Sequence, residues 1–315
     1  MEYIKQSMTF EIEGPTVLSL GKFDGLHRGH ELLMEYMREK KQEQQNLKAA
    51  VFTFDVPPSE QTQNLQMQVL TTSQEKARLF EENGIDYLIE CPFTREIMCM
   101  EPEEFIERIV KNLHVKDIVV GTDFRFGYKR RGDYQMLKQY APQYGYQLKV
   151  MPKMQEKGRD ISSTYIREEI AAGHIEKAHR LLGYPFFVEG NVLHGRKLGK
   201  AVLGIPTINL IPPSEKLLPP MGVYVTSTEY AGKHYPGITN VGCKPTIQGE
   251  NPIGVETHLF DISEDMYGRM VRVSFLKRVR PEQRFDSLDA LKAQMEQDIQ
   301  YGKVYFDIGK GVQKN

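Results

Sequence analysis

Residues 17–30 read VLSLGKFDGLHRGH, and they join a short apolar strand to a turn rich in glycine. The glycines at positions 21, 25 and 29 allow the backbone to approach a ligand closely. Beyond the turn, apolar residues recur at helical spacing over 32–37. A helix that starts after such a turn presents free N–H groups to an anion. The segment therefore predicts a strand–helix unit with an anion site at its turn.

The same turn carries two histidines, His27 and His30, with Gly29 between them. At this spacing both rings can face one phosphate group, either as positive or as neutral donors. The alternative is an exposed turn in which the two histidines only cap the helix. The order of strand, glycine-rich turn and helix favours the catalytic interpretation.

The rest of the first half alternates strand-like and helix-like segments. Strands are expected at 49–54, 87–89, 117–120 and 147–151. The spacing of residues 72–75, TSQE, is typical of a capping box, and Pro102 suits the first position of another helix. Alternation with short turns predicts a parallel sheet with crossover helices.

The pattern changes after residues 183–185, GYP, where short strands separated by turns take over. We place the domain boundary there, giving domains 1–184 and 185–315. The second domain is predicted to be an antiparallel barrel or sandwich closed by a terminal helix. Ser287 is the candidate N-cap of that helix, and one face would carry the apolar residues Leu288, Leu291, Met295 and Ile299.

Composition limits the function classes. A chain of 315 residues suits about two domains, and its net charge of −1 gives no global field for nucleic acid or an anionic membrane. No apolar run is long enough to cross a bilayer, and residues 1–10 lack the layout of a signal peptide. The three cysteines are far apart, which excludes a disulfide framework or a zinc knuckle. We therefore expect a cytoplasmic protein without nucleic-acid or membrane partners; its oligomeric state stays open.

A second glycine-rich stretch, residues 190–209, reads GNVLHGRKLGKAVLGIPTIN. Its spacing is not that of a P-loop. Thr207 and Asn209 alternate along an extended segment, so both side chains point the same way. Neutral oxygens of this kind, with ATP phosphates and water, suit Mg²⁺. On composition alone, a glycine-rich barrel loop is an equally good interpretation.

The first turn resembles the ATP-binding turn of nucleotidylyltransferases with an H-x-G-H signature, specifically that of bacterial FAD synthetases. Two later segments resemble the same family in the same order: 121–127, GTDFRFG, followed by Arg130, and 161–167, ISSTYIR. The resemblance implies a Rossmann-like α/β domain that transfers AMP from ATP to the phosphate of FMN and releases pyrophosphate.

Roles for individual residues follow from that resemblance. His27 and His30 would contact the ATP phosphates, and Ser163, Thr164 and Arg167 would hold the leaving pyrophosphate; by themselves residues 162–164 would be interpreted as a helix N-cap. Asp123 and Arg130 would shape the flavin or nucleotide site. The remaining implied ATP-binding residues are those of the turn: Gly21, Phe23, Asp24, Gly25 and Gly29.

One departure concerns residues 54–58, FDVPP, where the family usually has a stretch like FDPHP. The expected histidine is absent, so one polar group near the nucleotide is missing. We expect adenylylation to persist, even if slowly.

The second stretch resembles the signature of riboflavin kinases, G-R-x-L-G-x-x-x-x-G-x-P-T-x-N. Matching segments follow at 222–224, GVY, at 240–242, NVG, and at 255–261, VETHLFD. The resemblance implies a Greek-key barrel in which Glu256 is the general base, while Thr207 and Asn209 hold Mg²⁺. On a strand and without this motif, Glu256 would be interpreted as a surface residue. The implied ATP-binding residues are Gly195, Gly199, Lys200 and Pro206.

The leading hypothesis is a bifunctional enzyme of flavin cofactor synthesis, with riboflavin, FMN and ATP as small-molecule substrates and FMN and FAD as products. Two alternatives stay open. One is a riboflavin kinase whose adenylyltransferase is weak or lost, because residues 56–58 depart from the family. The other is a flavin-binding regulator without turnover, which would have no need for all three of the H-x-G-H turn, the P-T-x-N segment and Glu256.

Overall fold

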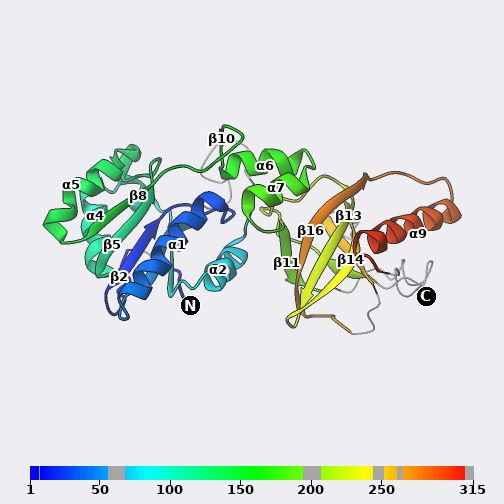
Figure 1. The fold of residues 1–315 in the computed structure, drawn as a ribbon, viewed down its shortest axis with the longest axis horizontal. Coiled ribbons are helices and arrows are strands. Elements are labelled where there is room, and N and C mark those ends of the chain that lie inside the picture. The colour runs from blue at the N-terminus through cyan, green and yellow to red at the C-terminus, as the bar shows by residue number, and fades with distance from the viewer. Residues whose placement is uncertain (7, 56–67, 194–206, 244–251, 261–264, 309–315) are drawn as a thin grey trace, which may run out of the picture. The chain divides into compact units, whose positions relative to one another are not determined.

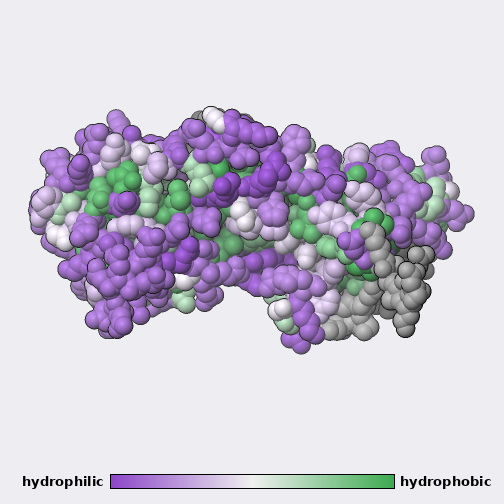
Figure 2. Space-filling view, in the orientation of Figure 1, coloured by the Kyte–Doolittle hydropathy of each residue, from purple (hydrophilic) through white to green (hydrophobic). Residues whose placement is uncertain are grey.

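The computed structural model describes residues 1–6, 8–55, 68–193, 207–243, 252–260 and 265–308. The chain forms two compact units, residues 1–163 and 164–315, and each is described by itself (Figure 1). On the face drawn in Figure 2, hydrophilic residues separate the hydrophobic ones into small groups. Among the described residues, no helix is both long and apolar enough to cross a membrane.

The first unit is built on a six-stranded sheet in the order β1-β4-β3-β2-β5-β8, and every neighbouring pair is parallel. Its strands are β1 (Glu2–Ile4), β2 (Thr16–Leu20), β3 (Lys48–Asp55), β4 (Tyr87–Pro92), β5 (Val115–Gly121) and β8 (Gln147–Met151). The predicted parallel α/β sheet is confirmed. The strand order reverses between β2 and β5, which is where ligands bind in sheets of this kind.

Helices cover the sheet. They are α1 (Arg28–Glu43), α2 (Ser73–Glu82), α3 (Arg95–Cys99), α4 (Pro102–Asn112) and α5 (Tyr134–Tyr144). The predicted capping box of α2 is present, since Thr72 and Glu75 exchange side-chain and backbone hydrogen bonds. Pro102 occupies the first turn of α4, as predicted. Helices α4 and α5 pack on the sheet face that carries Leu18 and Phe52, whereas α1 contacts β2, β3 and β5.

Short elements complete this unit: β6 (Arg125–Phe126), the 3₁₀ turn Tyr128–Arg130, β7 (Gly132–Asp133), β9 (Gln155–Glu156) and β10 (Arg159–Asp160). Strands β6 and β7 pair with each other, as do β9 and β10.

The second unit opens with two helices. Helix α6 (Ser163–Ala171) begins at the last residue of the first unit, and α7 (Ile175–Leu182) follows it. The six strands that come next are β11 (Phe187–Asn191), β12 (Ile208–Leu210), β13 (Gly222–Tyr230), β14 (Lys233–Cys243), β15 (Ile253–Leu259) and β16 (Met270–Pro281).

These strands form an antiparallel sheet in the order β11-β16-β13-β14-β15-β12. The arrangement β16-β13-β14-β15 is that of a Greek key, because the fourth strand returns beside the first. The edge strands approach each other as well: Leu193 forms an antiparallel bridge with Asn209, whose carbonyl accepts from the Leu193 N–H at 2.8 Å. Together with the parallel sheet of the first unit, this antiparallel sheet confirms the predicted fold class.

The terminal helix α9 (Leu288–Tyr305) starts at the predicted N-cap, Ser287, whose hydroxyl accepts from the backbone of Ala290. Its anchor is Asp298, which accepts three charge-assisted hydrogen bonds from Arg280 of β16 at 2.7, 3.0 and 3.2 Å. Gly302 lies so close to the barrel that a Cβ there would meet Phe260 at 2.7 Å.

The predicted apolar face of α9 is correct for Ile299, which packs against Val223, Val225 and Ile238. It is wrong for Leu288, which is 64% exposed. The ion pair of Asp298 and the close approach of Gly302 lie in the second half of the helix, whereas Leu288 in its first turn is exposed.

Candidate active sites

Contacts with the core fix the conformation of the turn after β2. The N–H of Gly21 donates to the carbonyl of Phe52 at 3.2 Å. Phe23 has a positive φ of 49° and is 1% exposed; its ring packs edge-on against Phe80, with centroids 5.4 Å apart. A Cβ on Gly21 would lie 3.0 Å from the Phe23 ring, so only glycine fits there without a shift. Phe23 therefore supports the turn from the core.

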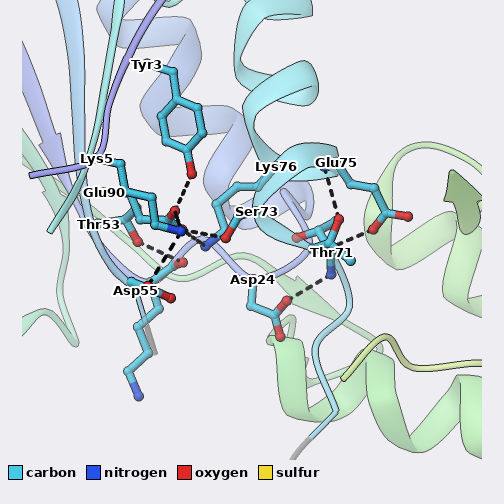
Figure 3. A network of polar contacts seen from close by, with 12 residues as sticks. Tyr3, Lys5, Asp24, Thr53, Asp55, Thr71, Ser73, Glu75, Lys76 and Glu90 are labelled. Carbon is cyan, nitrogen blue, oxygen red and sulfur yellow. Dashed lines mark hydrogen bonds and ion pairs between the residues drawn. The ribbon is translucent and has the colours of Figure 1, made fainter. Parts of the chain in front are cut away.

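Asp24 and Gly25 connect the turn to the residues that precede α2, and Figure 3 shows the bond between Asp24 and Thr71. The Asp24 carboxylate accepts from the N–H groups of Leu70 and Thr71 at 2.8 and 3.1 Å, and the Gly25 N–H donates to the Thr71 hydroxyl at 3.1 Å. The Ser163 hydroxyl donates to the Asp24 carbonyl at 2.7 Å. These bonds join three segments that are distant in sequence. The sequence analysis did not predict Thr71 as a site residue. The capping box at residues 72–75, next to Thr71, was a sequence pattern that could have indicated this region.

The two histidines stack, with ring centroids 3.8 Å apart and planes 16° from parallel. Gly29 makes this possible, since a Cβ there would lie 3.1 Å from the His27 ring. In the part of the chain that the structure describes, neither Nδ1 atom has a hydrogen-bond partner, and both are buried. A buried polar atom without a partner is costly, so these nitrogens fit a bound polar ligand.

Burial also favours the neutral form of both imidazole rings. It lowers the pKa of His27 from 6.5 to about 4 and that of His30 well below 6.5. Both rings are therefore neutral at pH 7. Of the two states considered for a phosphate contact, the neutral donor is the one that this environment supports.

The segment after β5 contributes Asp123 and Arg130. Asp123 is exposed and pairs with Lys153 at 3.4 Å, and Lys153 also pairs with Asp160 at 3.1 Å. Burial lowers the pKa of His27, and the Asp123 carboxylate opposes that shift, so Asp123 lies within electrostatic reach of His27. Arg130 is exposed, with a positive φ of 59°. Lys153 is a polar neighbour that the sequence patterns did not indicate.

Helix α6 carries the other predicted phosphate ligands. Ser163 is its first residue and is fixed by its bond to Asp24. Thr164 is exposed and Arg167 is partly buried. Being three residues apart on a helix, these two side chains share one face.

In the barrel, the structure brings the predicted kinase residues together. The Thr207 hydroxyl donates to Glu256 Oε1 at 2.8 Å. Asn209 of β12 lies directly opposite Glu256 of β15, and Asn240 of β14 pairs with Glu256 from the other side. Directly opposed residues place their side chains on the same face of a sheet. Asn240 was part of a recognised motif but was not predicted as a site residue.

A hydroxyl, an amide and a carboxylate offer oxygen donors of the kind that Mg²⁺ prefers. The residues at this position therefore fit the ion. Four predicted ATP-binding residues, Gly195, Gly199, Lys200 and Pro206, lie outside the described residues, as do residues 56–58, where the expected histidine is absent.

Comparison with known proteins follows this division of the chain. The family model for FAD synthetase matches residues 9–165, and the model for riboflavin kinase matches residues 182–306. A protein from Escherichia coli K12, named bifunctional riboflavin kinase/FMN adenylyltransferase, is 38% identical over 93% of this chain and 94% of its own. A protein of the same name from Haemophilus influenzae is 36% identical over 92% and 94%.

Among solved structures, one described as a macrolide-efflux protein from Streptococcus pneumoniae matches with a TM-score of 0.82 and 29% identity. The match covers 94% of this chain and 97% of the other, so the likeness extends over nearly all of both chains. Both family models match in the order in which the two sites occur, and the relatives match over nearly their full length. The chain therefore belongs to the family of bifunctional riboflavin kinase/FMN adenylyltransferases.

Proposed function

We propose that this protein phosphorylates riboflavin to FMN in residues 185–315 and adenylylates FMN to FAD in residues 1–184. The observation that carries the proposal is that Asn209 and Glu256 lie opposite each other on paired strands and that Thr207 hydrogen-bonds to Glu256. The stacked, neutral His27 and His30 support the second activity in the same chain.

For the kinase reaction, Glu256 accepts the proton of the ribityl 5′-hydroxyl. The hydroxyl oxygen attacks the γ-phosphorus of ATP, the bond to the bridging oxygen breaks, and ADP leaves. When bound, Mg²⁺ would be held by Thr207 and Asn209 and would neutralise charge on the phosphates. Gly195, Gly199, Lys200 and Pro206 complete the proposed ATP site.

For the adenylyl transfer, an oxygen of the FMN phosphate attacks the α-phosphorus of ATP and pyrophosphate leaves. The nucleophile is already ionised, so the site needs no strong base; it must position two anions and stabilise the charge that develops. We assign phosphate contacts to His27 and His30, and pyrophosphate contacts to Ser163, Thr164 and Arg167. The remaining proposed ligand-binding positions are Gly21, Phe23, Asp24, Gly25, Gly29, Asp123 and Arg130.

Both reactions consume ATP, and on that ground we propose a cytoplasmic location. The proposed partners are the small molecules ATP, riboflavin and FMN. With a net charge of −1, the chain gives no reason to add nucleic acid or an anionic membrane to them.

One assay tests the proposal and separates its alternatives. The full chain is incubated with riboflavin, ATP and Mg²⁺, and the flavins are resolved by chromatography. We expect FMN to form first and FAD to follow. FMN without FAD would leave a kinase whose adenylyltransferase is lost. Unchanged riboflavin would indicate a flavin-binding protein without turnover.

A further inference from the structure

A buried carboxylate, Glu90, lies near the carboxyl end of β4, in a group of polar residues that Figure 3 shows together with Asp24 of the first turn. Glu90 of β4 is 1% exposed and accepts hydrogen bonds from the Tyr3 hydroxyl and, at 2.9 Å, from the Ser73 hydroxyl. Lys5 adds an ion pair at 3.7 Å. Two hydrogen bonds and a cation thus stabilise the charge of Glu90 before Lys76 is considered.

Lys76 points into the same cluster from the first turn of α2. Its side chain is 10% exposed, and its ammonium lies 3.8 Å from Glu90 Oε1, beyond hydrogen-bond distance. An ammonium has three N–H donors. Within the described parts of the chain, this ion pair is its sole polar contact. A cation at a helix N-terminus also opposes the helix dipole. A structural role alone therefore does not explain a buried lysine at position 76.

The location of Lys76 relative to the histidines suggests a use for its charge. On α2, Lys76 lies one helical turn before Phe80, and Phe80 packs on Phe23, whose ring centroid is 5.0 Å from that of His30. Lys76 is therefore on the side of α2 that faces the turn. Its ammonium adds to the lowering of the His30 pKa that burial causes. Both histidines are neutral, so their imidazole rings supply no positive charge to an anionic ligand. Lys76 is a nine-tenths-buried cation beside that turn.

We propose that the Lys76 ammonium binds a phosphate group of a substrate in the first unit, while Glu90 holds it in place when the site is empty. This inference rests on the adenylyltransferase activity proposed above. The ligand is a phosphate oxygen, either of FMN or of ATP. Glu90 does not lose its compensation when Lys76 turns to the ligand, because Tyr3, Ser73 and Lys5 remain.

The test measures FAD formation from added FMN and ATP in Lys76→Met and Lys76→Arg. Methionine keeps the apolar length of lysine but has no charge. We expect Lys76→Met to raise KM by about 10- to 100-fold, the usual effect of losing a charge-assisted hydrogen bond. A rise in KM for FMN identifies the flavin phosphate, and a rise in KM for ATP identifies the triphosphate. Lys76→Arg should restore most of the affinity.

The double variant Lys76→Met/Glu90→Gln distinguishes binding from structure. It removes both buried charges, so it folds even if Lys76→Met alone does not. If Lys76 only balances Glu90, the double variant regains the wild-type KM, and the proposal is overturned. An unchanged KM in Lys76→Met overturns it too. A KM that stays high in a double variant with wild-type kinase activity supports it. A wild-type protein that makes FMN but no FAD would instead contradict the proposed adenylyltransferase.

Discussion

In the first unit the candidate ligand groups are imidazole rings buried at a helix start, whereas in the second unit they are side chains of paired strands. The nucleophiles proposed for the two reactions explain this difference. A phosphate is already ionised, and neutral donors that fix its position suffice for it. A hydroxyl must lose a proton, and the barrel site holds a carboxylate, Glu256, within hydrogen-bond distance of the Thr207 hydroxyl. Each of the following experiments tests this contrast.

The largest effect is expected for Glu256→Gln. Without a proton acceptor, the rate of FMN formation should fall by about 100- to 10,000-fold, while FAD formation from added FMN stays unchanged. Glu229→Gln, at the opposite end of β13 and β14, is the matched control. A kinase rate that survives Glu256→Gln would remove the distinction between the two sites.

The second effect is a loss of folding stability at acidic pH. An unfolded histidine titrates near 6.5, and burial lowers the pKa of folded His27 to about 4. The unfolded chain binds more protons between these values, so the first unit loses stability as the pH falls from about 6.5 to about 4, by about 3 kcal/mol for His27. Unfolding in urea at several pH values should show a smaller loss in His27→Gln. Equal slopes for the two proteins would mean that the imidazole is not buried and neutral.

His30→Gln should lower kcat/KM for FAD formation by about 100-fold, the scale for removing one group that stabilises transition-state charge. Kinase activity should not change, because the two sites share no residue. His114→Gln is the control, since its imidazole is half exposed on the surface of the first unit. If both variants behaved alike, the ring stack would be structural.

The smallest effect is expected for Ser163→Ala. It removes the bond to the Asp24 carbonyl and the proposed pyrophosphate contact, and we expect about a tenfold loss of FAD formation. Ser287→Ala removes a hydroxyl of comparable local role, the N-cap of α9, and should leave FAD formation intact while weakening the barrel unit by about 1 kcal/mol. The opposite pattern would contradict the assignment of Ser163 to the first site.

Local signals account for most of what the sequence predicted. Apolar runs and helical spacing located the central strands, and the capping box at Thr72 marked the start of α2. The sequence analysis did not predict strand β1, because three residues are too few to show the alternation of apolar and polar residues that indicates a strand. Helix α7 did carry a readable signal, since Ile175, Ala178 and Leu182 lie on one buried face.

The site residues likewise divide into those that the sequence indicated and those that it did not. The motifs pointed to His27, His30 and Glu256 because those residues occur in short, dense patterns. Lys76 and Glu90 lie 14 positions apart on a helix and a strand, and only the folded sheet brings them together. The exposure of Leu288 was equally hidden, because spacing shows which residues share a face but not how far a helix extends past its support.

The backbone of Asn209 has a second task besides carrying a candidate magnesium ligand. Its carbonyl accepts the Leu193 N–H, and this bond joins the two edges of the barrel sheet. The closure of the barrel sheet and the proposed kinase site thus share one residue, Asn209. Opening the bridge between Leu193 and Asn209 would therefore also displace Asn209 as a proposed magnesium ligand. A ligand bound to Asn209 would favour the closed form of the sheet.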